Sequence, residues 1–146
     1  LHRRRHSFPT RRSSDLASFT LDRNAHAGNV VICNAAAGMT VTLPASSGKG
    51  DVYKLLVGTT VTSNNFIVQV ANATDVMMGA VGLTTDIGGT VMPTAATDDT
   101  ITMNGSTKGG VKGSYVELKD VTAGFWLLSG NLLCTGTEAT PFSAAV

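Results

Sequence analysis

The segment Met39-Thr40-Val41-Thr42-Leu43-Pro44 decides the fold class of this chain of 146 residues. Apolar and polar side chains alternate from Met39 to Leu43, and Pro44 ends the pattern. A period of two residues is typical of a β-strand with one buried face. We therefore expect a strand that directs Met39, Val41 and Leu43 into a core.

The same alternation returns at residues 66–70, 100–103 and 115–119. Three continuous apolar runs, at residues 29–33, 52–57 and 125–128, predict strands that are covered on both faces. Pairs such as Gly28-Asn29 and Asn64-Asn65 supply turn signals between the segments. The predicted inward positions are Val41, Leu43, Phe66, Val68, Val116, Leu118, Phe125 and Trp126.

Helical spacing is not sustained over three turns anywhere in the sequence. Residues 71–78 could form one short helix at most. Short strands separated by Gly and Asn turns favour an all-β fold, either a small β-sandwich or a jelly-roll-like barrel of short antiparallel strands.

The charge of the chain is concentrated at one end. Of 11 Lys and Arg residues, five lie within residues 1–16, together with one of the 10 acidic residues. Residues 17–146 therefore carry six basic and nine acidic groups, a net charge of −3. A weakly acidic domain lacks the basic patch that binds nucleic acid. No apolar run approaches the ~20 residues of a membrane helix, so we expect neither nucleic acid nor a membrane as a partner.

Catalytic motifs are missing from the sequence. His26 is the single histidine after residue 16, and no zinc-binding or nucleophile-elbow spacing occurs. Asp98-Asp99 could contribute carboxylates to calcium, but adjacent Asp residues at a strand entrance more often form a turn or cap. We predict no catalytic, cofactor-binding or metal-binding residues, and a protein that is not an enzyme.

The two cysteines, Cys33 and Cys134, both adjoin apolar residues. This setting indicates buried small hydrophobic side chains. Two cysteines at unrelated spacing do not indicate an oxidising compartment, and whether they ever pair stays open.

The N-terminal residues 6–16, His-Ser-Phe-Pro-Thr-Arg-Arg-Ser-Ser-Asp-Leu, resemble letter for letter the translation of a common sequencing-library adapter. Segments of this kind are set aside before the fold is considered. We therefore expect residues 1–16 to be a non-native, disordered tail. The alternative is a genuine basic arm for nucleic acid or anionic lipid. The expected domain is residues 17–134, followed by a C-terminal extended arm or tail at 135–146.

Several segments resemble small virion proteins of tailed phages and prophages. They are residues 28–45, which include Val41-Thr42-Leu43-Pro44-Ala45, and residues 57–64, 70–77, 99–107 and 135–144. The resemblance covers most of residues 22–146 and implies a head-decoration or capsid-stabilising protein. It also implies a homo-oligomer, with a trimer favoured, that contacts the major capsid protein at the virion surface after production in the bacterial host cytoplasm.

An alternative function is a receptor- or glycan-binding module of a phage tail fibre or spike, because the Val-Thr-Leu-Pro-Ala element also occurs in fibre β-modules. Such a module should expose aromatic side chains beside polar ones. The candidates are Tyr53, Tyr115 and Trp126, and Trp126 stands within an apolar run.

Overall fold

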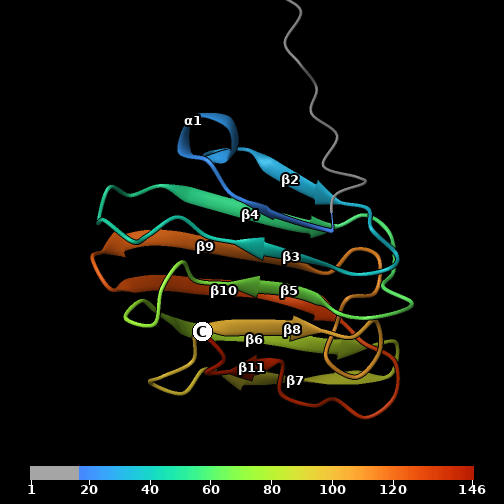
Figure 1. The fold of residues 1–146 in the computed structure, drawn as a ribbon. Helices are drawn as coiled ribbons and strands as arrows, with labels where there is room; N and C mark the ends of the chain where they lie inside the picture. Colours follow the sequence, from blue (N-terminus) through green and yellow to red (C-terminus); the bar gives the residue numbers. More distant parts are fainter. Residues whose placement is uncertain (1–16) are drawn as a thin grey trace, which may run out of the picture.

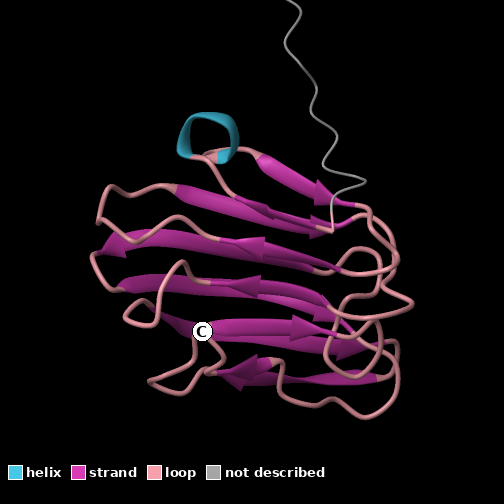
Figure 2. Cartoon of the chain, in the orientation of Figure 1, coloured by secondary structure: helices cyan, strands magenta, loops and turns pink. Residues whose placement is uncertain are grey.

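The fold is a sandwich of two β-sheets packed face to face (Figures 1 and 2). This computed structural model describes residues 17–146. The predicted tail, residues 1–16, lies outside the described residues. The predicted all-β sandwich is confirmed.

The five-stranded sheet has the order β1-β3-β5-β8-β11. Its strands are β1 (Ser18–Thr20), β3 (Met39–Thr42), β5 (Phe66–Gln69), β8 (Thr100–Met103) and β11 (Phe142–Ser143). β3 runs parallel to β1 and β5, whereas β8 runs antiparallel to β5 and β11. In Figure 1 this sheet lies nearer the viewer.

The six-stranded sheet has the order β2-β4-β9-β10-β6-β7. Its strands are β2 (Val30–Cys33), β4 (Val52–Val57), β6 (Val76–Thr85), β7 (Gly88–Pro93), β9 (Tyr115–Thr122) and β10 (Phe125–Leu133). The pairs β2–β4 and β6–β10 are parallel, and the other three pairs are antiparallel.

The sheets are thus mixed, which corrects the expectation of purely antiparallel strands. Parallel pairing arises because successive strands often belong to opposite sheets. β3, for example, lies in the five-stranded sheet while β2 and β4, on either side of it in sequence, pair with each other. Alternation of side chains reports which face of a strand is buried, but not which strand pairs with it.

The core lies between the two sheets. Val41, Leu43, Phe66, Val68, Val116, Leu118 and Trp126 are buried, as predicted. The rings of Tyr53 and Trp126 meet edge to face, with their centroids 5.8 Å apart. Edge-to-face contact of this kind is a favoured arrangement of two aromatic rings.

Phe125 is the exception among the predicted core positions, because it is only half-buried. Neighbouring residues of a strand point to opposite faces, so Phe125 and Trp126 cannot both enter the core. The register with β9 also shifts between these two residues.

The three apolar runs are covered on one face, not on two as predicted. In β2, Val31 and Cys33 are buried while Val30 and Ile32 are 53% and 48% exposed. In β10, Leu127 is 41% exposed between two buried neighbours. A continuous apolar sequence therefore conceals an alternation of buried and exposed positions.

The one helix within residues 17–146 lies elsewhere than the sequence suggested. α1 (Arg23–His26) begins after Asp22, whose carboxylate accepts hydrogen bonds from the backbone N–H groups of Asn24 and Ala25. Such capping satisfies N–H groups that have no partner within the helix. Residues 71–78 instead form a turn and the start of β6. Across residues 17–146 no helix has the length and apolar character to cross a membrane.

Residues 135–146, predicted as an extended arm or tail, lie along the edge of their own sheet. Phe142 in β11 pairs with Ile101 in β8 and is 9% exposed. The backbone N–H of Ala145 donates to Asp99 Oδ1 at 2.8 Å. The last residues thus pack against the domain that they follow.

Candidate functional site

The outer surface of the six-stranded sheet carries an unusual share of exposed apolar side chains. Eight large apolar residues of the described chain are exposed, and six of them lie on this surface. These six, which we call the apolar face, are Val30, Ile32, Met78, Val91, Val121 and Leu127. Clusters of exposed apolar side chains often mark surfaces that bind other proteins.

The register of the strands places part of the apolar face together. Leu127 in β10 lies directly beside Met78 in β6, and both are more than 40% exposed. On the other side Leu127 adjoins Lys119 in β9. Neighbours across a strand pair have side chains close enough to touch, so Leu127 and Met78 form a continuous apolar contact surface.

A charged band crosses the middle of the same sheet. Lys119 Nζ lies 3.1 Å from Glu117 Oε1, and Lys54 Nζ lies 4.7 Å from the centre of the Tyr115 ring. Half-exposed pairs of this kind contribute little to stability. The ion pair of Lys119 and Glu117 cancels one charge of each sign, and Lys54 leaves this band with one net positive charge.

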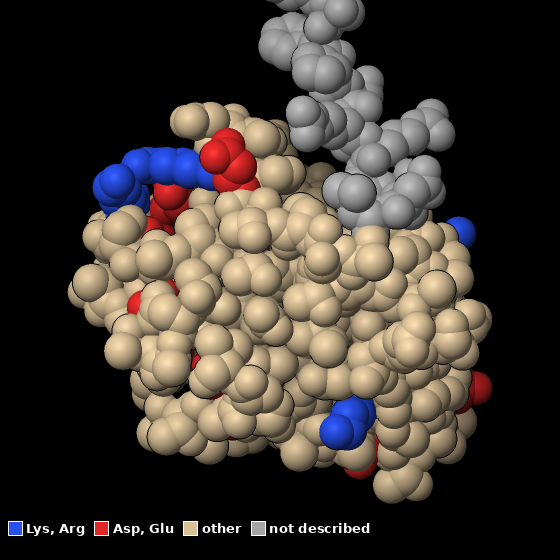
Figure 3. Space-filling view, viewed as in Figure 1, with Lys and Arg blue, Asp and Glu red and all other residues tan. Residues whose placement is uncertain are grey.

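The outer surface of the five-stranded sheet has a different chemistry. Its outward positions include Thr40, Thr42, Ile67, Gln69 and Thr102, which are half-buried and uncharged. Figure 3 shows few charged side chains across the middle of this side of the molecule. Both broad surfaces therefore suit contacts that depend on shape more than on charge.

The buried carboxylates hold loops in place. Asp120, 2% exposed, accepts hydrogen bonds from Ser47 N, Ser47 Oγ, Gly48 N and Lys49 N at 2.7–3.3 Å. Burial alone would raise the pKa of Asp120, but these hydrogen bonds outweigh it and the net pKa is lowered. Asp120 is thus a charged anchor for the loop at residues 46–49.

Asp75 anchors Ser46, the first residue of the same loop. Its carboxylate oxygens accept hydrogen bonds from Ser46 N at 2.8 Å and Ser46 Oγ at 2.9 Å. Ser46 Oγ accepts in turn from Gly124 N. Two buried carboxylates thereby join the 46–49 loop to β9, to Gly124 in the β9–β10 turn and to the residue that precedes β6.

Of the adjacent pair, Asp98 makes a contact within a turn, whereas Asp99 binds Thr100 and the backbone of the C-terminal residues. Asp98 Oδ2 accepts from Ala95 N at 2.7 Å, and Asp99 Oδ1 accepts from Thr100 Oγ1 at 2.7 Å. Within residues 17–146 no cluster of three or more His, Cys, Asp or Glu side chains could hold a metal ion.

His26 and the cysteines also have structural environments. Asp22 N donates a hydrogen bond to His26 Nδ1 at 2.8 Å, which ties the histidine to the start of α1. Cys33 and Cys134 are both buried and free. Burial raises the pKa of Cys33 to about 12 and also raises that of Cys134. A thiol held in its protonated form is a poor nucleophile and a poor metal ligand.

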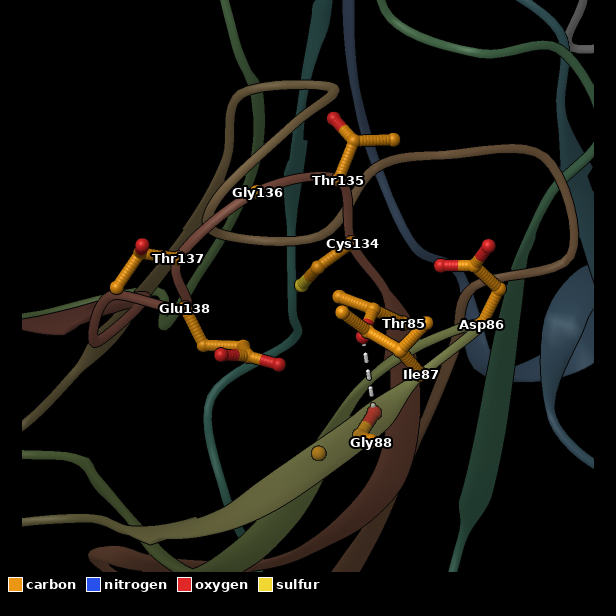
Figure 4. Close-up of a pocket in the computed structure, with 10 residues that line it drawn as sticks. Thr85, Asp86, Ile87, Gly88, Cys134, Thr135, Gly136, Thr137 and Glu138 are labelled. Atoms are coloured by element: carbon orange, nitrogen blue, oxygen red, sulfur yellow. Dashed lines mark hydrogen bonds between the residues drawn. The ribbon is translucent and has the colours of Figure 1, made fainter.

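One open depression of about 570 Å³ lies between the β6–β7 turn and the loop that follows β10. Its walls are residues 85–89 and 134–138 (Figure 4). Thr85 Oγ1 donates to the carbonyl of Gly88 within the first wall. The acidic residues Asp86 and Glu138 stand on opposite walls, and Asp86 and Ile87 are exposed to solvent.

Comparison of the chain with protein-family models, curated protein sequences and solved structures found no match. A fold alone does not define a function, so the surfaces themselves carry the functional argument. Half of the apolar face was missed at the sequence level because Val30, Ile32 and Leu127 lie in runs that were interpreted as covered on both faces. The strand pairing shows that these three side chains point to the outer surface of the sheet.

Proposed function

We propose that this protein is a structural, non-enzymatic virion component that decorates and stabilises the capsid of a tailed phage. The observation that carries the proposal is the concentration of six exposed apolar side chains on one sheet surface. The buried acidic side chains are occupied in loop anchoring, and the resemblance of residues 28–45 and 135–144 to phage virion proteins supports the same assignment.

The apolar face is large enough for a specific protein contact. Six strands at a spacing of ~4.8 Å, with ~3.3 Å per residue along each strand, give a surface of roughly 25 Å by 25 Å. The whole outer surface of this sheet, apolar face and charged band together, thus has an area of roughly 600 Å², which approaches the ~800 Å² that each partner buries in a typical stable complex. The major capsid protein is the proposed partner.

The mechanism of stabilisation is mass action. A protein that binds the assembled capsid lattice, and not its separate subunits, lowers the free energy of the lattice. Contacts at junctions between subunits would supply this preference, because the junctions exist only after assembly. Homo-oligomerisation, with a trimer favoured by the resemblance, would multiply such contacts.

The test is co-sedimentation of the full chain with capsids assembled from the major capsid protein of the same genome. Leu127→Ser should weaken binding at least tenfold, because Leu127 lies at the centre of the apolar face. Val146→Ser is the matched comparison, since both residues are 41% exposed but Val146 lies in the C-terminal segment. If Leu127→Ser binds capsids as well as the parent does and Val146→Ser loses capsid binding, the contact belongs to residues 135–146 instead.

The fibre-module alternative receives less support from the aromatic side chains. Tyr53 and Trp126 are 1% exposed in the core, which leaves the half-buried Tyr115 among the three candidates. Stacking on sugar rings needs exposed aromatic faces, and Lys54 already lies over the Tyr115 ring. A chain that ignores capsids and binds host surface glycans would overturn the decoration proposal.

A further inference from the structure

The strand β7 forms an open edge of the six-stranded sheet. Among the strands of residues 17–146 its one neighbour is β6, and five of its six residues are exposed. The backbone N–H of Thr94 donates to the Gly79 carbonyl at 3.0 Å. In an antiparallel ladder, the backbone N–H and carbonyl groups of successive residues point alternately toward the neighbouring strand and away from it. Thr90 and Met92 therefore face β6 with their backbone groups, whereas Gly89, Val91 and Pro93 direct theirs outward.

The outward edge has an arrangement of donors and acceptors that matches itself. Gly89 and Val91 each offer one N–H and one carbonyl, and Pro93 offers a carbonyl without an N–H. An antiparallel second copy centred on Thr90 would place Gly89 opposite Val91. Each of these two residues could then exchange both of its backbone hydrogen bonds with the other. Pro93 would fall opposite Ile87, beyond the paired region, so its missing N–H would leave no hydrogen bond of the new pairing unmade.

The side chains at this edge also suit such a pairing. Ile87 and Val91 are 93% and 69% exposed, the two highest values among the exposed large apolar residues of the described chain. Residues 88–93, Gly-Gly-Thr-Val-Met-Pro, contain no charge. A two-fold axis at Thr90 brings the β7 residues of one copy near the β7 residues of the other, so like charges on β7 would repel one another. Their absence removes that obstacle.

We propose that β7 pairs with β7 of a second copy about a two-fold axis at Thr90, joining the two six-stranded sheets into one. The inference goes beyond the proposed capsid contact, because it concerns a different partner and the backbone edge of β7, although Val91 also belongs to the apolar face. The edge spans about 20 Å at ~3.3 Å per residue, which is a short contact. Copies that are already held side by side gain most from it, because their effective concentration is high.

The pairing predicts one specific cross-link. Two residues directly opposite each other in a non-hydrogen-bonded pair have Cα atoms about 4.5 Å apart, within the range of a disulfide. The full-length Thr90→Cys variant should therefore form a disulfide-linked dimer under mild oxidation. Val91→Cys is the matched control, because Val91 would face Gly89 and lie too far from its own copy. The parent chain, with Cys33 and Cys134 buried, gives the background.

Sedimentation of the full chain at rising concentration measures the association without a cross-link. We expect a dimer that disappears in Val91→Lys, since a lysine on an edge strand blocks strand addition. Val121→Lys, on the same sheet surface but away from β7, should leave the dimer intact. Both positions are exposed, and equal melting temperatures would show that the variants fold.

Three results would overturn the inference. Thr90→Cys could cross-link no faster than Val91→Cys, or the association could survive Val91→Lys unchanged. A parent chain that stays monomeric at every concentration would overturn it as well. Failure of capsid binding alone, with the Thr90→Cys dimer intact, would refute the proposed function and leave the strand pairing standing.

Discussion

Replacing Asp120 with asparagine should destabilise the domain more than its small change in shape suggests. Asp120 Oδ1 accepts hydrogen bonds from Ser47 N and Gly48 N, and Oδ2 accepts from Ser47 Oγ and Lys49 N. An asparagine that keeps its oxygen at the Oδ1 position retains the first two. Its NH₂ group then faces the Lys49 N–H, and the charge that strengthens all four bonds is gone.

The expected loss follows from these contacts. Hydrogen bonds to a charged group contribute about 1.5–3 kcal/mol each, and neutral ones about 1 kcal/mol. Weakening two bonds and losing the Lys49 bond should therefore cost about 2–4 kcal/mol of the free energy of unfolding. The backbone N–H of Lys49 can turn to solvent, because Lys49 is exposed, which keeps the loss within this range.

Urea unfolding at pH 7 measures the loss, with Asp86→Asn in the exposed β6–β7 turn as the control. The difference between Asp120→Asn and the parent should also depend on pH. Because the pKa of Asp120 is lowered in the fold, its contribution is full above the ordinary aspartate value of about 4 and is lost as the pH falls through the lowered value. A variant within about 0.5 kcal/mol of the parent at pH 7, the scatter of ordinary surface substitutions, would refute this account.

Three further outcomes are expected. Trp126→Ala should lower the free energy of unfolding by about 3–5 kcal/mol, as for other emptied aromatic sites. Phe125→Ala should lower it distinctly less, because Phe125 is half-buried. Equal losses by chemical denaturation would mean that the strand faces are misassigned. Deleting residues 1–16 should leave the melting temperature within a few degrees, whereas a larger fall would make the segment part of the fold. A reductant should not change the melting temperature, since Cys33 and Cys134 are free.

The sequence predicted strand positions and their buried side chains best where one face of the strand is polar. In β3, β5 and β9 the alternation identified both the strand and its buried side chains, such as Val41, Val68 and Leu118. The reason is physical, since an outward Thr, Gln or Glu marks the solvent side directly. In β2 and β10 the outward residues are Val, Ile and Leu, so the same alternation was hidden.

The β6–β7 hairpin was the largest omission. Gly79 and Gly82 interrupt the apolar pattern of β6, and the pair Gly88-Gly89, which begins β7, is typical of a turn. A Cβ atom at Gly79 would lie against the Leu128 carbonyl of the neighbouring strand, so glycine is required there by close approach of the backbone. Neither feature can be inferred from local sequence. The contact at Gly79 depends on a strand more than 40 residues away in sequence, and the open edge depends on β7 having no second neighbour among the described strands.

The alternation of strands between the two sheets has a kinetic consequence. β4 cannot complete its pairing until β9 has been synthesised, and ribosomes add about 5–20 residues per second. The nearly 60 residues between these strands correspond to a delay of roughly 3–12 s. During that interval β2 and β4 lack the rest of their sheet, and such incomplete edges are prone to aggregation. Pairings so distant in sequence also fold slowly, on a scale of about milliseconds to seconds. The nascent chain therefore passes through a vulnerable period in which chaperones would act, before any copy can reach its assembly partner.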